Sequence, residues 1–145
     1  MITKPVEPRD NHLWGTKFKD KLWGLGGNDT LLGLGDNDIL KGGNGSDKLF
    51  GGQGNDKMTG GSGADTFVFS KHSGRDIITD FDIKKDMIQI AKGIHGIKKP
   101  ADVIDHAKQH GDDVIIDLGG GNKIILKDVK LSDLKKSPED HFDIG

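Results

Sequence analysis

The chain has 145 residues, of which 23 are glycine, none is cysteine and 32% are hydrophobic, and its formal charge is −2. This length predicts a single domain. The absence of cysteine excludes disulfides, thiol nucleophiles and Cys-ligated zinc, and a charge so close to zero argues against a nucleic-acid partner. No apolar run approaches the length of a transmembrane helix, and the first residues lack the apolar segment of a cleaved signal peptide.

Residues 1–14 form a lead-in, and residues 11–14 look like the last part of a degenerate repeat. Residues 15–68 then hold six consecutive nine-residue units without insertion or deletion. Each unit opens on glycine and has Asp at its sixth place and a large apolar residue at its eighth. The aspartates are Asp20, Asp29, Asp38, Asp47, Asp56 and Asp65. The apolar residues are Leu22, Leu31, Leu40, Leu49, Met58 and Phe67. A constant short period of this kind predicts a solenoid.

The nine places divide into a six-residue turn and a three-residue strand. Because strand side chains alternate, places six and eight point inward and places seven and nine point outward. Two units then make one flattened coil with a strand on each side, and the apolar residues of both strands meet inside. Successive coils stack at ~4.8 Å, so the aspartates of turns n and n+2 lie close together.

Two bare carboxylates ~5 Å apart repel by roughly 3 kcal/mol at an effective dielectric constant of ~20. A hard dication reverses that sign, and calcium accepts six to eight oxygen ligands, including turn carbonyls. Magnesium fits less well, because it demands tighter octahedral geometry and keeps its waters. The alternative is a set of solvated turns in which Asp and Asn act only as turn formers, and six turns in register argue against it.

Residues 42–50, 51–59 and 60–68 match the pattern G-G-x-G-x-D-x-U-x at every fixed place. The repeat therefore resembles that of the RTX family. The resemblance implies a right-handed parallel β-roll with calcium between turns n and n+2. One turn would offer its Asp and the carbonyls of places one and three, and the other its Asp and the carbonyls of places two and four. Lys17 and Lys19 make the pair of turns one and three the weakest.

The earlier units depart from the pattern, because Leu25 and Leu34 replace the second glycine and Asp36 replaces the glycine at place four. Six turns give four pairs and hence about four calcium ions. The sequence after the repeats resembles the end of serralysin-type and alginate-epimerase-type modules, in which a later Asp, here Asp76, closes a fifth site. The predicted metal-binding residues are Gly24, Gly26, Asp29, Gly33, Gly35, Asp38, Gly42, Gly43, Asn44, Gly45, Asp47, Gly51, Gly52, Gln53, Gly54, Asp56, Gly61, Gly63, Asp65 and Asp76.

The rest of the chain predicts short strands and a single helix. The helix is expected over residues 100–110, because Pro100 suits a first turn and Gly111 a C-terminal stop. Strands are expected at 76–81, 86–90, 114–118, 123–127 and within 137–145. The predicted fold is therefore all-β: a right-handed parallel β-roll (15–76) with a lead-in (1–14), capped by C-terminal strands and one short helix (77–145) in one continuous domain.

The outward places divide between two faces. Lys21, Trp23, Lys41 and Lys57 form a basic face that suits an anionic polysaccharide such as alginate, although an ordinary solvated sheet explains the same residues. The other face carries the column Trp14, Leu32, Phe50 and Val68, which should be covered by the C-terminal strands or the helix.

These features predict a non-catalytic calcium-binding module that folds on extracellular calcium. The resemblance further implies the C-terminal part of a protein secreted by type I machinery, expected to be a monomer without a membrane span. The alternative function is a polysaccharide-binding module that assists a separate catalytic domain. An enzyme is disfavoured, because H-E-x-x-H and phosphate-binding motifs are absent and G-x-S-x-G fails at Ala64. His106 and His110, four residues apart on the predicted helix, are interpreted as surface residues.

Overall fold

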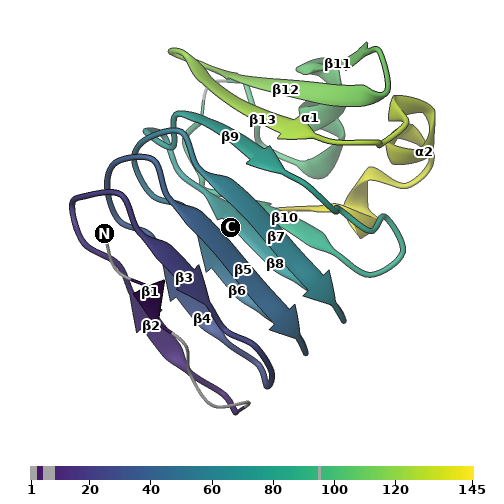
Figure 1. Cartoon of the computed structure of the whole chain (residues 1–145). Helices are drawn as coiled ribbons and strands as arrows, with labels where there is room; N and C mark the ends of the chain where they lie inside the picture. Colours follow the sequence, from purple (N-terminus) through teal and green to yellow (C-terminus); the bar gives the residue numbers. More distant parts are fainter. Residues whose placement is uncertain (1–2, 5–8, 95) are drawn as a thin grey trace.

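Two β-sheets face each other in the computed structural model, which describes residues 3–4, 9–94 and 96–145 (Figure 1). The eight-stranded sheet has the order β1-β3-β5-β7-β9-β13-β12-β11, and the six-stranded sheet has the order β14-β10-β8-β6-β4-β2. The strands of the first are β1 (Thr3–Lys4), β3 (Lys21–Trp23), β5 (Ile39–Asn44), β7 (Lys57–Ser62), β9 (Arg75–Ile78), β13 (Asn122–Leu126), β12 (Asp113–Gly119) and β11 (Ala107–His110). Those of the second are β2 (His12–Trp14), β4 (Thr30–Leu32), β6 (Lys48–Phe50), β8 (Thr66–Phe69), β10 (Met87–Ile90) and β14 (Phe142–Ile144).

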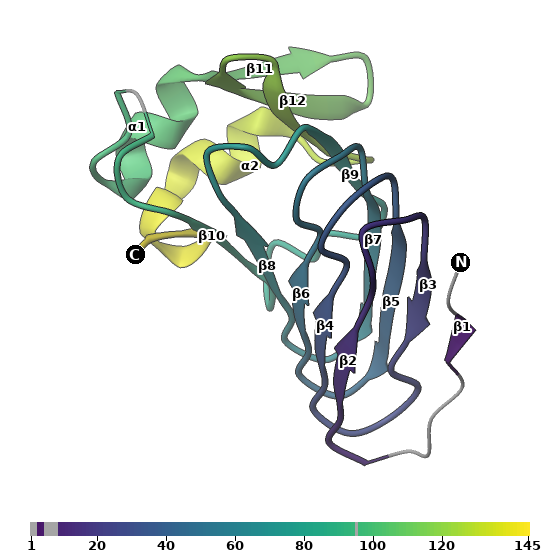
Figure 2. The same cartoon turned by 90° about the vertical axis from the view of Figure 1, so that its left-hand side faces the viewer.

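The repeats alternate between the two sheets, so each strand pairs in parallel with the strand two units away. Leu22 lies beside Leu40 in one sheet, and Leu31 lies beside Leu49 in the other. Figure 2 shows the result as a flattened coil that passes from one sheet to the other at every turn. The predicted parallel β-roll is confirmed. The lead-in also forms part of it, because β2 pairs in parallel with β4.

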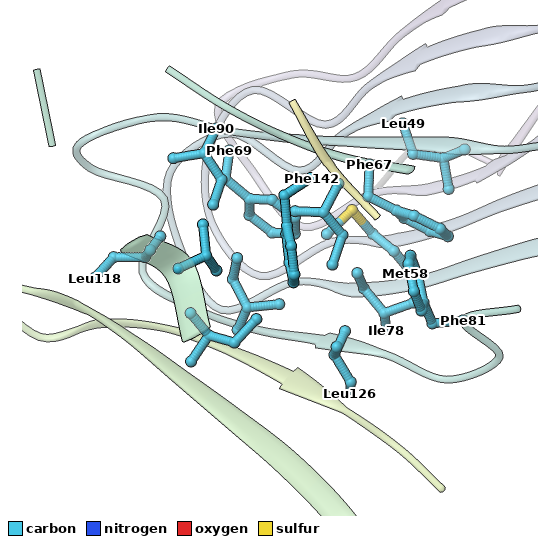
Figure 3. Close-up of a cluster of buried hydrophobic side chains, with 14 of the residues drawn as sticks. Leu49, Met58, Phe67, Phe69, Ile78, Phe81, Ile90, Leu118, Leu126 and Phe142 are labelled. Atoms are coloured by element: carbon cyan, nitrogen blue, oxygen red, sulfur yellow. The ribbon is translucent and has the colours of Figure 1, made fainter. Parts of the chain in front are cut away.

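The core lies between the sheets and is built from place eight of every unit. All six of these side chains are fully buried: Leu22, Leu31, Leu40, Leu49, Met58 and Phe67. The same cluster continues without interruption from Leu13 to Phe142, so the roll and the C-terminal elements share one core (Figure 3). Burial of a large apolar side chain stabilises a fold by ~1.5–3 kcal/mol, so this column alone is a major source of stability.

The C-terminal elements extend each sheet at its last coil. Strand β13 pairs in parallel with β9, placing Ile124 beside Asp76, and a hairpin then adds β12 and β11 in antiparallel order. In the other sheet, β14 pairs in parallel with β10 and places Phe142 beside Ile88. None of the helices in the described part of the chain is long and apolar enough to cross a membrane.

Two expectations for the C-terminal part were wrong. Helix α1 covers only Pro100–Asp105, because Ala107–His110 pairs with β12 as strand β11 and buries Ala107 beside Ile116. Two further helical segments, α2 (Leu131–Lys136) and the 3₁₀ helix η1 (Pro138–Asp140), were not predicted. Tertiary pairing decides such short segments, since their local preferences differ by little.

The apolar column on the outer face of the six-stranded sheet is also not covered as expected. Trp14 is 55% exposed, whereas Leu32, Phe50 and Val68 are half-buried. The reason is topological: β14 extends the edge of this sheet beside β10 and does not cross its outer face.

Candidate metal centre

The repeat aspartates form two columns of buried carboxylates. Each is at most 2% exposed, although an isolated buried carboxylate is strongly unfavourable. We name each turn by its sixth residue. One column holds the Asp20, Asp38, Asp56 and Asp76 turns, and the other holds the Asn11, Asp29, Asp47, Asp65 and Asp86 turns. Because consecutive units alternate between the sheets, the columns lie at the two opposite connections of the coil (Figure 2).

One oxygen of each carboxylate bonds to the neighbouring turn of its column. Oδ1 of Asp47 accepts the backbone N–H of Asp29 at 2.8 Å, and Oδ1 of Asp65 accepts that of Asp47 at 3.0 Å. The same bond joins Asp38 to Asp56 and Asp56 to Asp76, at 2.8 Å each. Oδ1 is therefore used for stacking the turns, and it fixes the direction of the second oxygen.

The second oxygen, Oδ2, is buried and has no hydrogen-bond partner among the described residues at six positions: Asp29, Asp38, Asp47, Asp56, Asp65 and Asp76. Such oxygens call for an explanation, because nearly all buried polar atoms in proteins are paired. A bound cation would give each of these buried carboxylate oxygens the partner that it lacks.

Backbone carbonyls converge on the same points. A Cβ built on Gly24 would overlap both Asp29 Oδ2 and the carbonyl oxygen of Gly42 in the next turn of the column. The equivalent point at Gly33 meets Asp38 Oδ2 and the Gly51 carbonyl, and that at Gly42 meets Asp47 Oδ2 and the Gly60 carbonyl. Two oxygens from adjacent turns thus face one place, and any side chain at the first glycine would fill it.

The carbonyls of places two and four point from the earlier turn of a pair toward the later turn. A Cβ on Gly43, whose φ is +100°, would overlap the Leu25 carbonyl oxygen, and a Cβ on Gly45 would overlap the Gly27 carbonyl oxygen. The arrangement therefore offers oxygen from both turns of a pair, as the resemblance implied. Among the described residues, no group of three acidic, histidine or cysteine side chains is arranged to hold a metal ion by side chains alone.

Several of these carboxylates are difficult to ionise without a cation. Burial, together with the carboxylates of adjacent turns, raises the pKa of Asp38 to about 7, of Asp47 to about 6 and of Asp65 to about 7. Burial and the neighbouring carboxylates also raise the pKa of Asp56. The backbone N–H that each Oδ1 accepts lowers the pKa but does not offset the loss of solvation.

The two ends of the columns differ from the middle. Oδ2 of Asp20 accepts the backbone N–H and the hydroxyl of Thr16, at 2.5 and 3.0 Å. The first turn therefore lacks the unpartnered Oδ2 of the middle turns, and its predicted weakness as a metal site stays a prediction. At the other end, Asp76 follows the repeat pattern, with Oδ1 bonded to Asp56 and Oδ2 unpartnered.

Apart from Leu25 and Gly27, whose carbonyls are described above, two residues belong to this arrangement that the sequence analysis did not assign. Asp86 ends the second column, because its Oδ1 accepts the Asp65 N–H at 2.9 Å, but its Oδ2 accepts the Asp82 N–H at 2.8 Å and so caps the stack. The step from Asp86 to Ile88, which repeats the spacing of places six and eight, was the available signal. Gly60 is the second, since its carbonyl faces Asp47.

The predicted metal-binding residues otherwise lie in these turns. Asn44 and Gln53, at place three, donate their backbone N–H groups to the carbonyls of Leu25 and Leu34. Leu25, Leu34 and Asp36 replace glycine but adopt left-handed φ of 76°, 77° and 66° nevertheless. The backbone path of the turn is therefore kept where the sequence departs from the pattern, and those residues carry its strain.

A groove crosses the outer face of the eight-stranded sheet. It is lined by Lys21, Trp23, Ile39, Lys41, Lys57 and Thr59, and the Lys41 Nζ lies 5.9 Å from the centre of a Trp23 ring. A second groove shares Lys57 and continues past Arg75, His110 and Lys127. The four residues predicted to bind a polysaccharide are thus brought together.

The fold and the turns define a parallel β-roll built from calcium-binding nonapeptides. The model of the RTX calcium-binding nonapeptide repeat matches residues 8–40 and 32–67. This part of the chain therefore consists of RTX calcium-binding repeats, and the resemblance found in the sequence is confirmed for it. No curated protein sequence matches the chain significantly.

A solved structure has a similar fold over nearly the whole chain. The extracellular lipase LipA from Serratia marcescens is similar with a TM-score of 0.58 at 23% identity, over 98% of this chain. The match covers 20% of that chain, so the present sequence spans about a fifth of the lipase. The AlgE6R3 subunit from the Azotobacter vinelandii mannuronan C5-epimerase aligns at 25% identity with a TM-score of 0.48, covering 99% of this chain and 87% of that one.

Proposed function

We propose that this chain is a non-catalytic module that folds when it binds about four calcium ions, with a fifth site if Asp76 closes one. The observation that carries the proposal is the set of six buried carboxylate oxygens without a hydrogen-bond donor among the described residues. Each ion would lie between adjacent turns of a column and use one carboxylate from each turn together with carbonyls. The ligands would be those predicted from the repeats, with the addition of Gly60.

The same carboxylates make folding depend on calcium. Without a cation, the stacked turns must bury charges that repel one another, or hold protons that raised pKa values favour. An ion that binds only the folded chain adds RT ln(1 + [L]/Kd) per site to its stability. Several sites acting together would leave the chain unfolded at low calcium and folded at the millimolar calcium found outside cells.

This coupling supports a secreted protein as the context, exported unfolded through type I machinery and folded outside the cell. Four or five bound ions would also supply the cross-links that a chain without cysteine lacks. The module would act as a monomer, because both sheets are extended within the same chain by β11–β13 and β14.

Circular dichroism of chelator-stripped protein tests the proposal directly. We expect little β signal in EDTA at pH 7.5, a cooperative gain on titration with calcium and no equivalent gain with magnesium. Isothermal titration calorimetry on the same samples should count about four ions. A β spectrum that is complete in EDTA and indifferent to calcium would refute the proposal.

A second candidate function is the binding of an anionic polysaccharide on the outer face of the eight-stranded sheet. The groove beside Lys21, Lys41 and Lys57 supports it, because it combines cationic side chains with an aromatic surface at Trp23. Arg75 adds one cation to the second groove, in which Lys127 is paired with Asp113 at 2.8 Å and Asp128 is a further carboxylate. A linear polyanion could thus lie across several strands.

The test compares two variants of equal charge by titration with alginate oligomers. Replacing Lys21, Lys41 and Lys57 by alanine should weaken binding at least tenfold. The control replaces Lys48, Lys84 and Lys135, which lie outside the groove, and should weaken it by less than twofold. Equal losses in both variants would show that only net charge matters and that the groove is no site.

A further inference from the structure

A second ladder of hydrogen bonds runs beside the aspartates, through the residues at place five. Oδ1 of Asn28 accepts the Ser46 N–H at 2.8 Å, and Oδ1 of Asn37 accepts the Asn55 N–H at 2.7 Å. Oδ1 of Asn55 in turn accepts the Arg75 N–H at 2.9 Å. Each bond joins two adjacent turns of one column by a neutral side chain.

The two ladders run in opposite directions. At place five the side chain of the earlier turn accepts from the later turn, whereas at place six the side chain of the later turn accepts from the earlier one. Between the Asp38 and Asp56 turns, Asn37 accepts from Asn55 while Asp56 accepts from Asp38, at 2.7 and 2.8 Å. We call this pair of opposed bonds the reciprocal clamp.

The reciprocal clamp is present at some turn pairs and absent at others. It joins the Asn11 and Asp29 turns, where Asp10 takes the place-five role, and also the Asp29–Asp47, Asp38–Asp56 and Asp56–Asp76 pairs. It is incomplete between the Asp47 and Asp65 turns, because no hydrogen bond of the described residues uses the Ser46 side chain. The clamp is also incomplete between the Asp20 and Asp38 turns, because the Lys19 side chain offers no acceptor. The backbone N–H of Asn37 donates instead to Asp36 Oδ1 at 2.8 Å.

The reciprocal clamp forms without a metal ion, and it fixes the position of the aspartates that would bind one. Two bonds on consecutive residues fix both the distance and the tilt between turns, and the buried Oδ2 then faces the carbonyl of the next turn. We propose that Asn28, Asn37 and Asn55 are positioning residues for the calcium sites: they set the gap between turns before an ion enters. This inference rests on the proposed calcium function.

Two consequences follow for binding. The clamped Asp29–Asp47 and Asp38–Asp56 pairs bind calcium more tightly than the unclamped Asp47–Asp65 pair. The gap also determines which ion fits, since ligand distances separate a smaller from a larger cation. Loss of the clamp therefore lowers the preference for calcium over the larger strontium ion, which loss of general stability would not do.

The experiment compares place-five variants of the whole chain. One net hydrogen bond contributes about a fivefold factor to the folding equilibrium, and about four ions taken up together share it. Asn37→Ala should therefore raise the calcium midpoint of the β signal about 1.5-fold and should lower the calcium-to-strontium preference. Asn37→Asp keeps the acceptor, as Asp10 does naturally, and should restore both. Ser46→Ala removes a place-five side chain that makes no hydrogen bond to a described residue, and should change neither.

A gain of function gives the sharper test. Ser46→Asn supplies the missing acceptor opposite Ala64 without a change of charge, and should lower the midpoint about 1.5-fold, for the same reason. Asn28→Ala repeats the loss in the other column should Asn37→Ala fail to fold. Equal effects of Asn37→Ala and Ser46→Ala, or no recovery in Asn37→Asp, would overturn the inference. A wild-type protein that does not respond to calcium would instead refute the proposed function itself.

Discussion

Replacing Asp47 by asparagine should change the stability of the protein in opposite directions with and without calcium. Asp47 lies in the middle of its column, and its unpaired Oδ2 faces the carbonyl of Gly60. Asparagine keeps the Oδ1 acceptor for the Asp29 N–H and replaces Oδ2 by an amide that can donate to that carbonyl. The variant thus removes a buried charge and gives the Gly60 carbonyl a hydrogen-bond donor.

The magnitudes follow from the geometry. In EDTA, two carboxylates one strand spacing apart repel by about 3 kcal/mol at an effective dielectric constant of ~20, so relief at Asp47 should stabilise the fold by about 2–3 kcal/mol. In calcium, Asp47 serves the pairs on both sides. An ion at 100 times its Kd contributes about 2.7 kcal/mol, so loss of both ions removes about 5 kcal/mol. After the gain of about 2–3 kcal/mol in the calcium-free fold, the net loss in calcium should be about 2–3 kcal/mol.

At pH 7.5, titration with the folding osmolyte trimethylamine N-oxide measures the value in EDTA, where the chain is expected to be unfolded, and urea denaturation measures the value in millimolar calcium. The matched control is Asp112→Asn, the same chemical change at an exposed carboxylate, which should stay within about 0.5 kcal/mol in either condition. A loss of similar size with and without calcium would refute the reasoning, because it would make Asp47 a structural residue with no link to the ion.

Three further predictions concern pH, strain and packing. Because the folded-state pKa values of Asp38 and Asp65 are raised to about 7, the calcium-free fold binds more protons than the unfolded chain. Its free energy of unfolding should be highest below pH 4 and fall as the pH rises through 7, and calcium affinity should rise over pH 5–8 with release of protons. Calorimetry in buffers of different ionisation enthalpy measures that release, and a pH-independent affinity would contradict it. Leu34→Gly should stabilise the fold by about 1 kcal/mol, because it removes left-handed strain at φ 77° that exceeds the entropy cost of glycine, whereas Leu34→Ala should not. Thermal unfolding in calcium compares the two, and equal midpoints would exclude strain. Leu40→Ala, at a fully buried position, should cost 2–5 kcal/mol in urea with calcium present, and a loss below 1 kcal/mol would mean that the column is loosely packed.

The roll could be predicted from the sequence because its period fixes both geometry and chemistry. A nine-residue spacing places Asp47 and Leu49 on the same inward side of the strand, whatever lies elsewhere in the chain. The C-terminal part has no such period. Residues 107–110 fit a helix locally, and only pairing of Ala107 with Ile116 makes them a strand.

The site was predictable in its carboxylates and less so in its details. The repeat identified Asp29 and its equivalents, but the hydrogen bonds that separate Oδ1 from Oδ2 depend on the exact offset of stacked turns. Asp86 has the right spacing to Ile88, yet its second oxygen is bonded to Asp82, a contact that requires the loop conformation. The role of Asn28 was likewise hidden, since asparagine is common in any turn.

The alternation of the chain between two columns has a consequence for how ions communicate. Each turn is joined to the turn above it by stacking and to the opposite column by a strand of only three residues, as in β4 and β6. Such a molecule is a one-dimensional lattice with two kinds of neighbour. Order that begins at one turn can spread along its own column and across to the other column. Half-filled rolls should therefore be rare, and the response to calcium should be steep and cooperative.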